Sequence, residues 1–134
     1  KLRIRLTLLN LLRNAPSQEW NRAVAETAAF AAKSPMNALL LAQALLQIAE
    51  PPQLPARQIL ELAKQAEAYF RTNGRKQLLA QALETLARAN YATCRLDDAI
   101  AAQREAVQIR EERKDSGLLG AKEMLNFYEN LKKL

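Results

Sequence analysis

The hexapeptide LLAQAL fills residues 40–45 and returns unchanged at residues 78–83, so the two copies lie 38 residues apart (78 minus 40). Identity continues at the same offset beyond the hexapeptide. A fixed period between about 20 and 50 residues is typical of proteins built from stacked repeats. The repetition therefore predicts a repeat architecture and, through it, a binding role. The further identical pairs are Ala49 with Ala87, Ala63 with Ala101, Gln65 with Gln103, Glu67 with Glu105 and Ala68 with Ala106.

The composition favours helices over strands. The 134 residues include only 3 Gly and 5 Pro, and Ala, Leu, Gln, Glu, Arg and Lys dominate, which are the residues that lose least on entering a helix. Aromatic residues make up 5% and Val is rare, which disfavours a sheet. The length suits one domain with its own core. We expect a single all-α domain over residues 1–134, and, because the chain begins with Lys1, a processed form or an excerpt of a longer protein.

Local signals divide the chain into about seven helices. Ser34 followed by Pro35 is a cap with a first-turn proline, and Asn73-Gly74 is a left-handed stop signal. Pro51, Pro52 and Pro55 predict a longer turn before the fourth helix. The expected helices are 2–14, 17–33, 35–49, 55–71, 75–94, 97–114 and 118–133.

Helices of this length joined by short turns pack antiparallel to their neighbours. We therefore expect three hairpins and one additional helix at the end of the chain. The expected units are the hairpins 2–33, 35–72 and 75–114 and the terminal helix 118–133.

Residues 83–107 resemble a tetratricopeptide repeat (TPR), whose pattern is a large residue, Leu, a small residue and Tyr on one helix, then Ala, Phe and Ala on the next. The resemblance implies a TPR-like superhelix, a right-handed stack of antiparallel hairpins, with its small residues at close helix contacts. The chain departs from the pattern at Asn90 and Gln103, where the family has aromatic residues, and its 38-residue period exceeds the usual 34. The matching positions are Leu83, Leu86, Ala87, Asn90, Ala99, Gln103 and Ala106.

The same resemblance implies a binding surface on the concave face of the stack. Carried over residue by residue, it selects helix positions one turn apart that face away from the partner helix. The alternative is that these residues are merely exposed, since three hairpins make a shallow groove. The implied binding residues are Gln81, Glu84, Arg88 and Tyr91, then Gln43 as the repeat copy of Gln81, and Lys122 and Tyr128 on the last helix.

Two other residues have competing interpretations. Trp20, the only tryptophan, suits either a ligand-stacking platform or a core anchor, and the core is favoured because so large a ring normally buries most of its area. Cys94 lies at a turn beside Arg95, a cation that could lower the pKa of a thiol. The favoured interpretation of Cys94 is a small, partly buried residue that fills the turn.

Several classes of function are disfavoured. The chain has no His and a single Cys, so the commonest general base is missing and a zinc site is excluded. No phosphate-binding or nucleophile motif is present. We expect a non-catalytic protein without a cofactor. No apolar run is long enough to span a bilayer, so we expect a soluble protein without membrane insertion, with the cytoplasm favoured.

The main hypothesis is a protein–protein interaction module or scaffold that binds a peptide or a partner domain. One rival is an accessory or regulatory domain of a larger bacterial redox or transcription-regulator protein. It rests on a resemblance of residues 84–87 and 99–107 to helical tails of bacterial thioredoxin-like proteins, and of residues 95–99 to sensor regions of large bacterial activators. The other rival is nucleic-acid binding through the basic N-terminal end. It is disfavoured, because the net charge of +6 comes mostly from Lys1, Arg3, Arg5 and Arg13 and no base-reading motif accompanies them. A homo-oligomer stays open.

Overall fold

The computed structural model describes residues 1–49 and 54–134, and over these residues it consists of seven α-helices without strands. The all-α prediction is confirmed for this part of the chain, and every predicted helix end falls within two residues of the observed one. Pro51 and Pro52 lie outside the described residues. The helices are α1 (Leu2–Leu12), α2 (Ser17–Ala31), α3 (Pro35–Ile48), α4 (Ala56–Thr72), α5 (Lys76–Ala92), α6 (Leu96–Arg113) and α7 (Leu118–Lys132).

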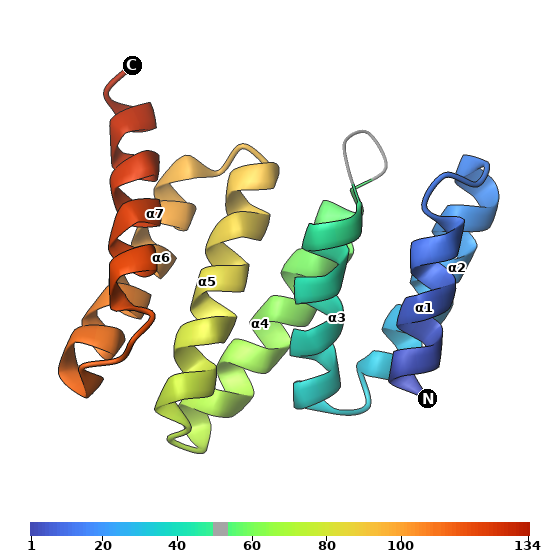
Figure 1. The fold of residues 1–134 in the computed structure, drawn as a ribbon, viewed down its shortest axis with the longest axis horizontal. Coiled ribbons are helices and arrows are strands. Elements are labelled where there is room, and N and C mark those ends of the chain that lie inside the picture. The colour runs from blue at the N-terminus through green and yellow to red at the C-terminus, as the bar shows by residue number, and fades with distance from the viewer. Residues whose placement is uncertain (50–53) are drawn as a thin grey trace.

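The helices form two layers (Figure 1). The odd-numbered helices α1, α3, α5 and α7 make the layer nearer the viewer, and α2, α4 and α6 lie behind them. Each helix packs against the next in the chain, and α3 also contacts α1 and α5 within its own layer. The helices α3, α5 and α7 share one face of this layer, and α1 continues the layer at the N-terminal end, where it forms a hairpin with α2.

Short polar turns stop and restart the helices. The Ser34 side chain accepts a hydrogen bond from the Asn37 backbone N–H at 3.4 Å, and Pro35 opens α3, as the sequence predicts. Gly74 ends the turn after α4 with φ +66°. At the corresponding place after α5, Cys94 takes the same left-handed conformation with φ +62°. Cys94 is exposed, which corrects the expectation that it fills the turn as a partly buried residue.

Small residues set the spacing between the helices. Ala87, Ala99 and Ala106 are each 0% exposed, as expected for positions where two helices approach closely. Two groups of buried side chains form the core, one centred on α5 and α6 and one on α1 to α4, and Leu86 packs against both. Trp20 is 1% exposed within the second group, so its predicted place in the core is confirmed.

The repeat continues through both helices of a hairpin, but with two different offsets. In α3 and α5 the 38-residue offset relates buried to buried positions, such as Leu41 to Leu79. In α4 and α6 it fails, because Ala63 is buried whereas Ala101 is exposed. The pattern of burial there repeats at 40 residues (99 minus 59), which corrects the 38-residue pairing of these helices. The buried pairs at the new offset are Ile59 with Ala99, Ala63 with Gln103, Ala66 with Ala106 and Phe70 with Arg110.

Ala99→Leu tests this packing. The added side chain has no room in α6, so we expect it to lower the free energy of unfolding by about 1–3 kcal/mol. The matched control is Ala101→Leu, two residues further along the same helix but exposed. Thermal and denaturant unfolding would measure both. Equal stabilities for the two variants would contradict the assignment of buried positions in α6.

Cys94→Gly tests the left-handed turn. A side chain in this conformation is strained, and glycine is not, so we expect Cys94→Gly to raise the free energy of unfolding by about 0.5–1 kcal/mol. Cys94→Ala keeps the Cβ and therefore the strain, and we expect it to leave denaturant unfolding nearly unchanged. Equal stabilisation by Ala and Gly would show that the thiol, rather than the backbone, is responsible.

Candidate functional site

A continuous groove runs along the face made by α3, α5 and α7. It consists of two adjoining hollows, of about 430 Å³ and about 390 Å³, which share Arg88 and Met124. We call the whole surface the inner groove, the first hollow its polar half and the second its apolar half. The polar half is lined by Gln43, Gln47, Gln81, Glu84, Thr85, Arg88, Gln103, Gly120, Ala121 and Met124, and the apolar half by Leu46, Ala49, Leu54, Arg88, Tyr91, Ala92, Met124, Phe127 and Tyr128.

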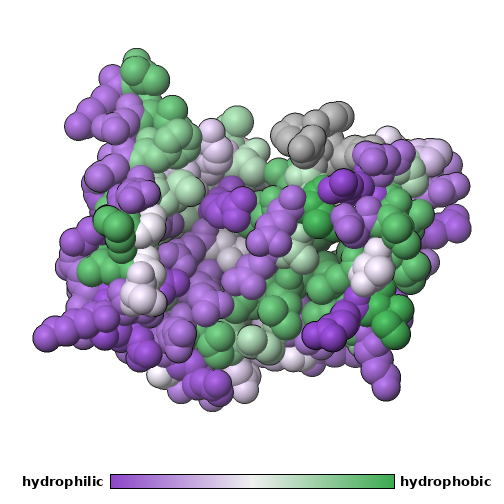
Figure 2. All heavy atoms as spheres, viewed as in Figure 1, coloured by the Kyte–Doolittle hydropathy of each residue, from purple (hydrophilic) through white to green (hydrophobic). Residues whose placement is uncertain are grey.

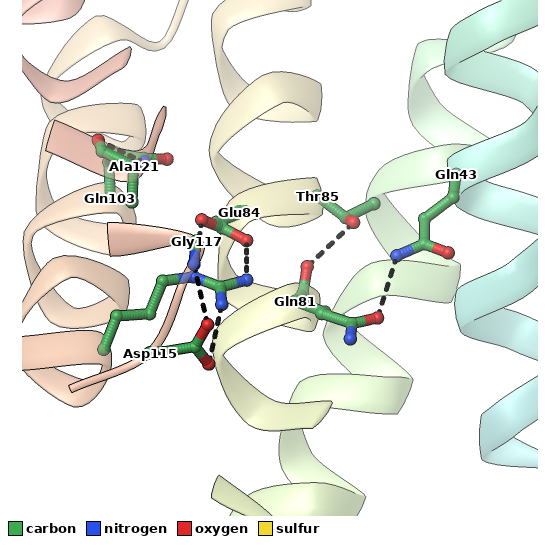
Figure 3. A network of polar contacts seen from close by, with 9 residues as sticks. Gln43, Gln81, Glu84, Thr85, Gln103, Asp115, Gly117 and Ala121 are labelled. Atoms are coloured by element: carbon green, nitrogen blue, oxygen red, sulfur yellow. Dashed lines mark hydrogen bonds and ion pairs between the residues drawn. The ribbon is translucent and has the colours of Figure 1, made fainter. Parts of the chain in front are cut away.

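The two repeated glutamines meet in the polar half (Figure 3). Nε2 of Gln43, on α3, donates to Oε1 of Gln81, on α5, at 3.4 Å. The Thr85 hydroxyl donates to the Gln81 carbonyl oxygen at 2.9 Å, which is a bond within α5. Each glutamine keeps further donor and acceptor capacity, because an amide side chain can make up to four hydrogen bonds. The repeat therefore places a pair of amides on the floor of the groove.

Arg110 holds the Glu84 side chain, which is the acidic residue that lines the polar half. Its guanidinium is held by both oxygens of Glu84, with Nε–Oε2 at 3.0 Å and Nη2–Oε1 at 2.6 Å. Nη1 lies 3.0 Å from Oδ2 of Asp115 in the α6–α7 turn. Arg110 is only 8% exposed, and its hydrogen bond to Glu84 raises the pKa of the guanidinium. A buried cation with two carboxylate partners thus joins α5, α6 and the turn that leads into α7.

The start of α7 is held by two more contacts. The Gly117 backbone N–H donates to Oδ1 of Asp115 at 2.8 Å, and this bond is the main cause that lowers the pKa of Asp115. Nε2 of Gln103, which is 1% exposed, donates to the Ala121 carbonyl oxygen at 2.9 Å. Gln103 stands where the TPR pattern has an aromatic residue, and its amide bonds to the α7 backbone.

Aromatic rings form the upper wall of the apolar half. The ring centroids of Tyr91 and Phe127 lie 5.8 Å apart at an interplanar angle of 71°, and those of Tyr91 and Tyr128 lie 5.5 Å apart. Tyr91 and Phe127 are 44% and 46% exposed, whereas Tyr128 is 1% exposed and burial raises its pKa to about 12. Figure 2, in the view of Figure 1, shows hydrophilic residues beside the lower part of α5 and hydrophobic residues on the upper part of α7.

Six of the seven predicted site residues line the inner groove, but one of these six, Tyr128, is buried, and the seventh, Lys122, lies outside the groove. Lys122 is not among the lining residues and pairs with Glu111 of α6 at 3.2 Å. Tyr128 contributes to the wall of the apolar half but is buried. The other five residues that line the groove are Gln43, Gln81, Glu84, Arg88 and Tyr91.

Sequence reasoning missed much of the α7 side of the groove. Gly120, Met124 and Phe127 follow one another at helical spacing and all line it. A glycine inside a helix is itself a signal, because it weakens the helix and usually has a packing or functional reason. A Cβ added at Gly120 would have no neighbour within 4 Å, so this residue leaves the groove wall open.

The basic N-terminal end is a separate surface. Of its arginines, Arg5 lies with its guanidinium carbon 4.5 Å from the centroid of the Phe30 ring, so this cation is engaged within the first hairpin. Ile4, Leu8 and Leu11 on α1 are 65%, 52% and 74% exposed. The exposed side of α1 is thus largely apolar between its cations.

Within the described residues, no three His, Cys, Asp or Glu side chains are grouped so as to hold a metal ion. In the same part of the chain, no helix is long and apolar enough to cross a membrane. Comparisons with protein-family models, with curated proteins and with solved structures found no match to this chain.

The Arg110 cluster predicts an acid-sensitive stability. The pKa of Asp115 is lowered below its usual 3.8 in the folded protein, so the stabilisation it gives is present above that value and is lost as the pH falls through the lowered pKa. Glu105 adds to the effect, since its hydrogen bond with Arg71 also lowers its pKa.

Asp115→Asn tests the contribution of this one carboxylate. The amide oxygen can still accept from Gly117, but the charge facing Arg110 is lost. We expect Asp115→Asn to be less stable than the parent at pH 7 and the difference to shrink between pH 4 and pH 2. Denaturant unfolding across this range would measure it. A difference that is constant with pH would mean that Asp115 acts only through its hydrogen bond.

Proposed function

We propose that this chain is a non-catalytic protein-interaction module, a TPR-like right-handed stack of hairpins whose inner groove binds an extended segment of a partner protein. The observation that carries the proposal is the groove itself, a hollow that continues from amides to exposed aromatic rings along three helices. Tyr91 and Phe127 offer rigid apolar area that loses little entropy on binding, and tyrosine and arginine are enriched where interfaces gain most of their affinity.

The helical framework supports this role. Gln81, Glu84, Arg88 and Tyr91 all stand on α5, which packs against α3, α4 and α6. A segment that binds along α5 would therefore meet a surface already in place, and binding to such a surface costs less than ordering a loop. Stacked helical repeats commonly bind partners through their concave faces.

The accessory-domain rival is compatible with this proposal, because such a domain can also act by binding. The nucleic-acid rival would use α1 instead. There, weak binding that falls steeply with added salt is expected of scattered exposed cations. Tight, sequence-selective binding at physiological salt would favour that rival.

The test uses a random linear peptide library selected against the parent protein. Gly120→Trp places a large ring in the polar half, where the groove wall is open, and we expect it to weaken binding of the enriched peptides at least tenfold. Leu119→Trp is the matched control, since Leu119 is the neighbouring residue on α7, is 69% exposed and does not line the groove. Fluorescence anisotropy would measure both. Equal binding by the two variants, or a library that yields no binder, would sink the proposal.

Arg88→Ala combined with Tyr91→Ala provides a second test. Both side chains are exposed, so we expect the helical circular dichroism to be preserved, with a fall in the melting temperature no larger than the loss of the ring contacts with Phe127 and Tyr128 explains. The enriched peptides should bind markedly less well. Unchanged binding would place the interaction surface elsewhere on the molecule.

A further inference from the structure

Arg88 occupies the point where the two halves of the inner groove meet. It lines both hollows and is exposed. Among the described residues, the only other charged one that lines either hollow is Glu84, one helical turn earlier on α5. A glutamate four residues before an arginine on a helix ordinarily pairs with it. The state of Glu84 therefore decides whether Arg88 is available to a partner.

Glu84 is already engaged by another cation. Both of its carboxylate oxygens accept hydrogen bonds from Arg110, whose guanidinium is buried and held also by Asp115. A bidentate pair of this kind is strong and directional. Among the described residues Arg88 has no hydrogen bond or ion pair. Arg110 thus engages both carboxylate oxygens of Glu84, and among the described residues the guanidinium of Arg88 is left without a hydrogen-bond or ion-pair partner.

The residues around Arg88 indicate which side chains would lie next to an acidic residue bound to its guanidinium. On one side, the apolar half presents Tyr91, Phe127 and Met124, which are 44%, 46% and 37% exposed. Aromatic rings and a flexible thioether accept large apolar side chains of varied shape. On the other side, Gln43 and Gln81 present amides that can bond to the backbone of an extended chain.

We infer that the inner groove selects an extended protein segment in which an acidic residue lies beside a large apolar residue, with the carboxylate on Arg88 and the apolar side chain in the apolar half. This inference rests on the proposed function, and it adds the chemistry of the partner. A partner segment with a basic residue at that place would bring a second positive charge beside Arg88 and is therefore disfavoured.

The experiment compares three fluorescein-labelled octapeptide pools by anisotropy. In every pool the flanking positions hold Ala, Ser, Gly or Thr in equal mixture. Each pool also has one fixed pair of residues, either adjacent or separated by one residue. The fixed pair is Glu and Leu in the first pool, Gln and Leu in the second, and Glu and Ala in the third. We expect the parent protein to bind the Glu–Leu pool about fivefold more tightly than the Gln–Leu pool, since an exposed charge pair contributes about 1 kcal/mol. The Glu–Leu pool should also bind at least fivefold more tightly than the Glu–Ala pool, because Leu buries more apolar area than Ala. Added salt should reduce the preference for Glu over Gln but not the preference for Leu over Ala.

Variants of Arg88 isolate its role. Arg88→Gln should bind the Glu–Leu and Gln–Leu pools equally, and Arg88→Lys should keep the preference for Glu. Arg88→Glu should instead prefer a Lys–Leu pool. Because Arg88 is exposed, circular dichroism should be the same for all three variants.

The outcomes separate this inference from the proposed function. If the parent binds the Glu–Leu and Gln–Leu pools equally while Gly120→Trp still abolishes binding, the groove is an interaction site but the acidic selectivity is wrong. If Arg88→Gln retains the preference for Glu, the carboxylate binds elsewhere and the inference is overturned. If none of the pools binds while library peptides do, the inference fails and the proposed function stands.

Discussion

The burial of one guanidinium group governs the C-terminal half of this molecule. Arg110 occupies the place that Phe70 fills one hairpin earlier, so a charge is buried where the repeat has an aromatic ring. A buried charge is tolerated only with partners, and the two partners, Glu84 and Asp115, belong to α5 and to the α6–α7 turn. The turn is thereby tied to both helices, and α7 must leave it in the direction that closes the groove.

The Arg110 guanidinium lies so close to the backbone of the α6–α7 turn that residue 117 must be glycine. A Cβ at this position would lie 2.7 Å from Nη1 of Arg110, nearer than packed atoms approach. Glycine therefore lets the turn pass against the guanidinium while its N–H binds Asp115. The electrostatic cluster and the path of the backbone depend on each other, and both determine where Gly120, Met124 and Phe127 stand relative to α5.

The helices could be predicted from the sequence because their signals are local. Caps, prolines and the Asn73-Gly74 stop depend on neighbouring residues, and the observed helices begin and end close to the predicted positions. The α3 and α5 side of the groove could also be predicted, since the repeated hexapeptide gives Gln43 and Gln81 the same environment. The pairing of Arg110 with Glu84 joins residues 26 positions apart on different helices, and no local pattern indicates it.

The α7 side could not be predicted because α7 has no copy in the repeat from which to infer its orientation. Lys122 and Tyr128 are six residues apart, which in a helix of 3.6 residues per turn places them on different faces. Lys122 accordingly turns towards α6, and Tyr128 enters the core. The repeat offset in α4 and α6 was also predicted wrongly from the sequence. Sequence identity at 38 residues extends into α4 and α6, but burial there follows 40, because chance identities among abundant Ala, Gln and Glu do not constrain packing.

The two ends of the stack are held very differently, and this has a consequence for partial unfolding. The main contacts of α1 are with α2 and α3 only, and Ile4, Leu8 and Leu11, each more than half exposed, gain little from burial in the folded state. Repeat proteins lose structure one unit at a time when a terminal unit is weakly coupled to its neighbour. Opening of the α1–α2 hairpin therefore requires only a fraction of the free energy of global unfolding. The α6–α7 end is tied by ionic contacts, so we expect the molecule to fray from its N-terminal side while the groove stays assembled.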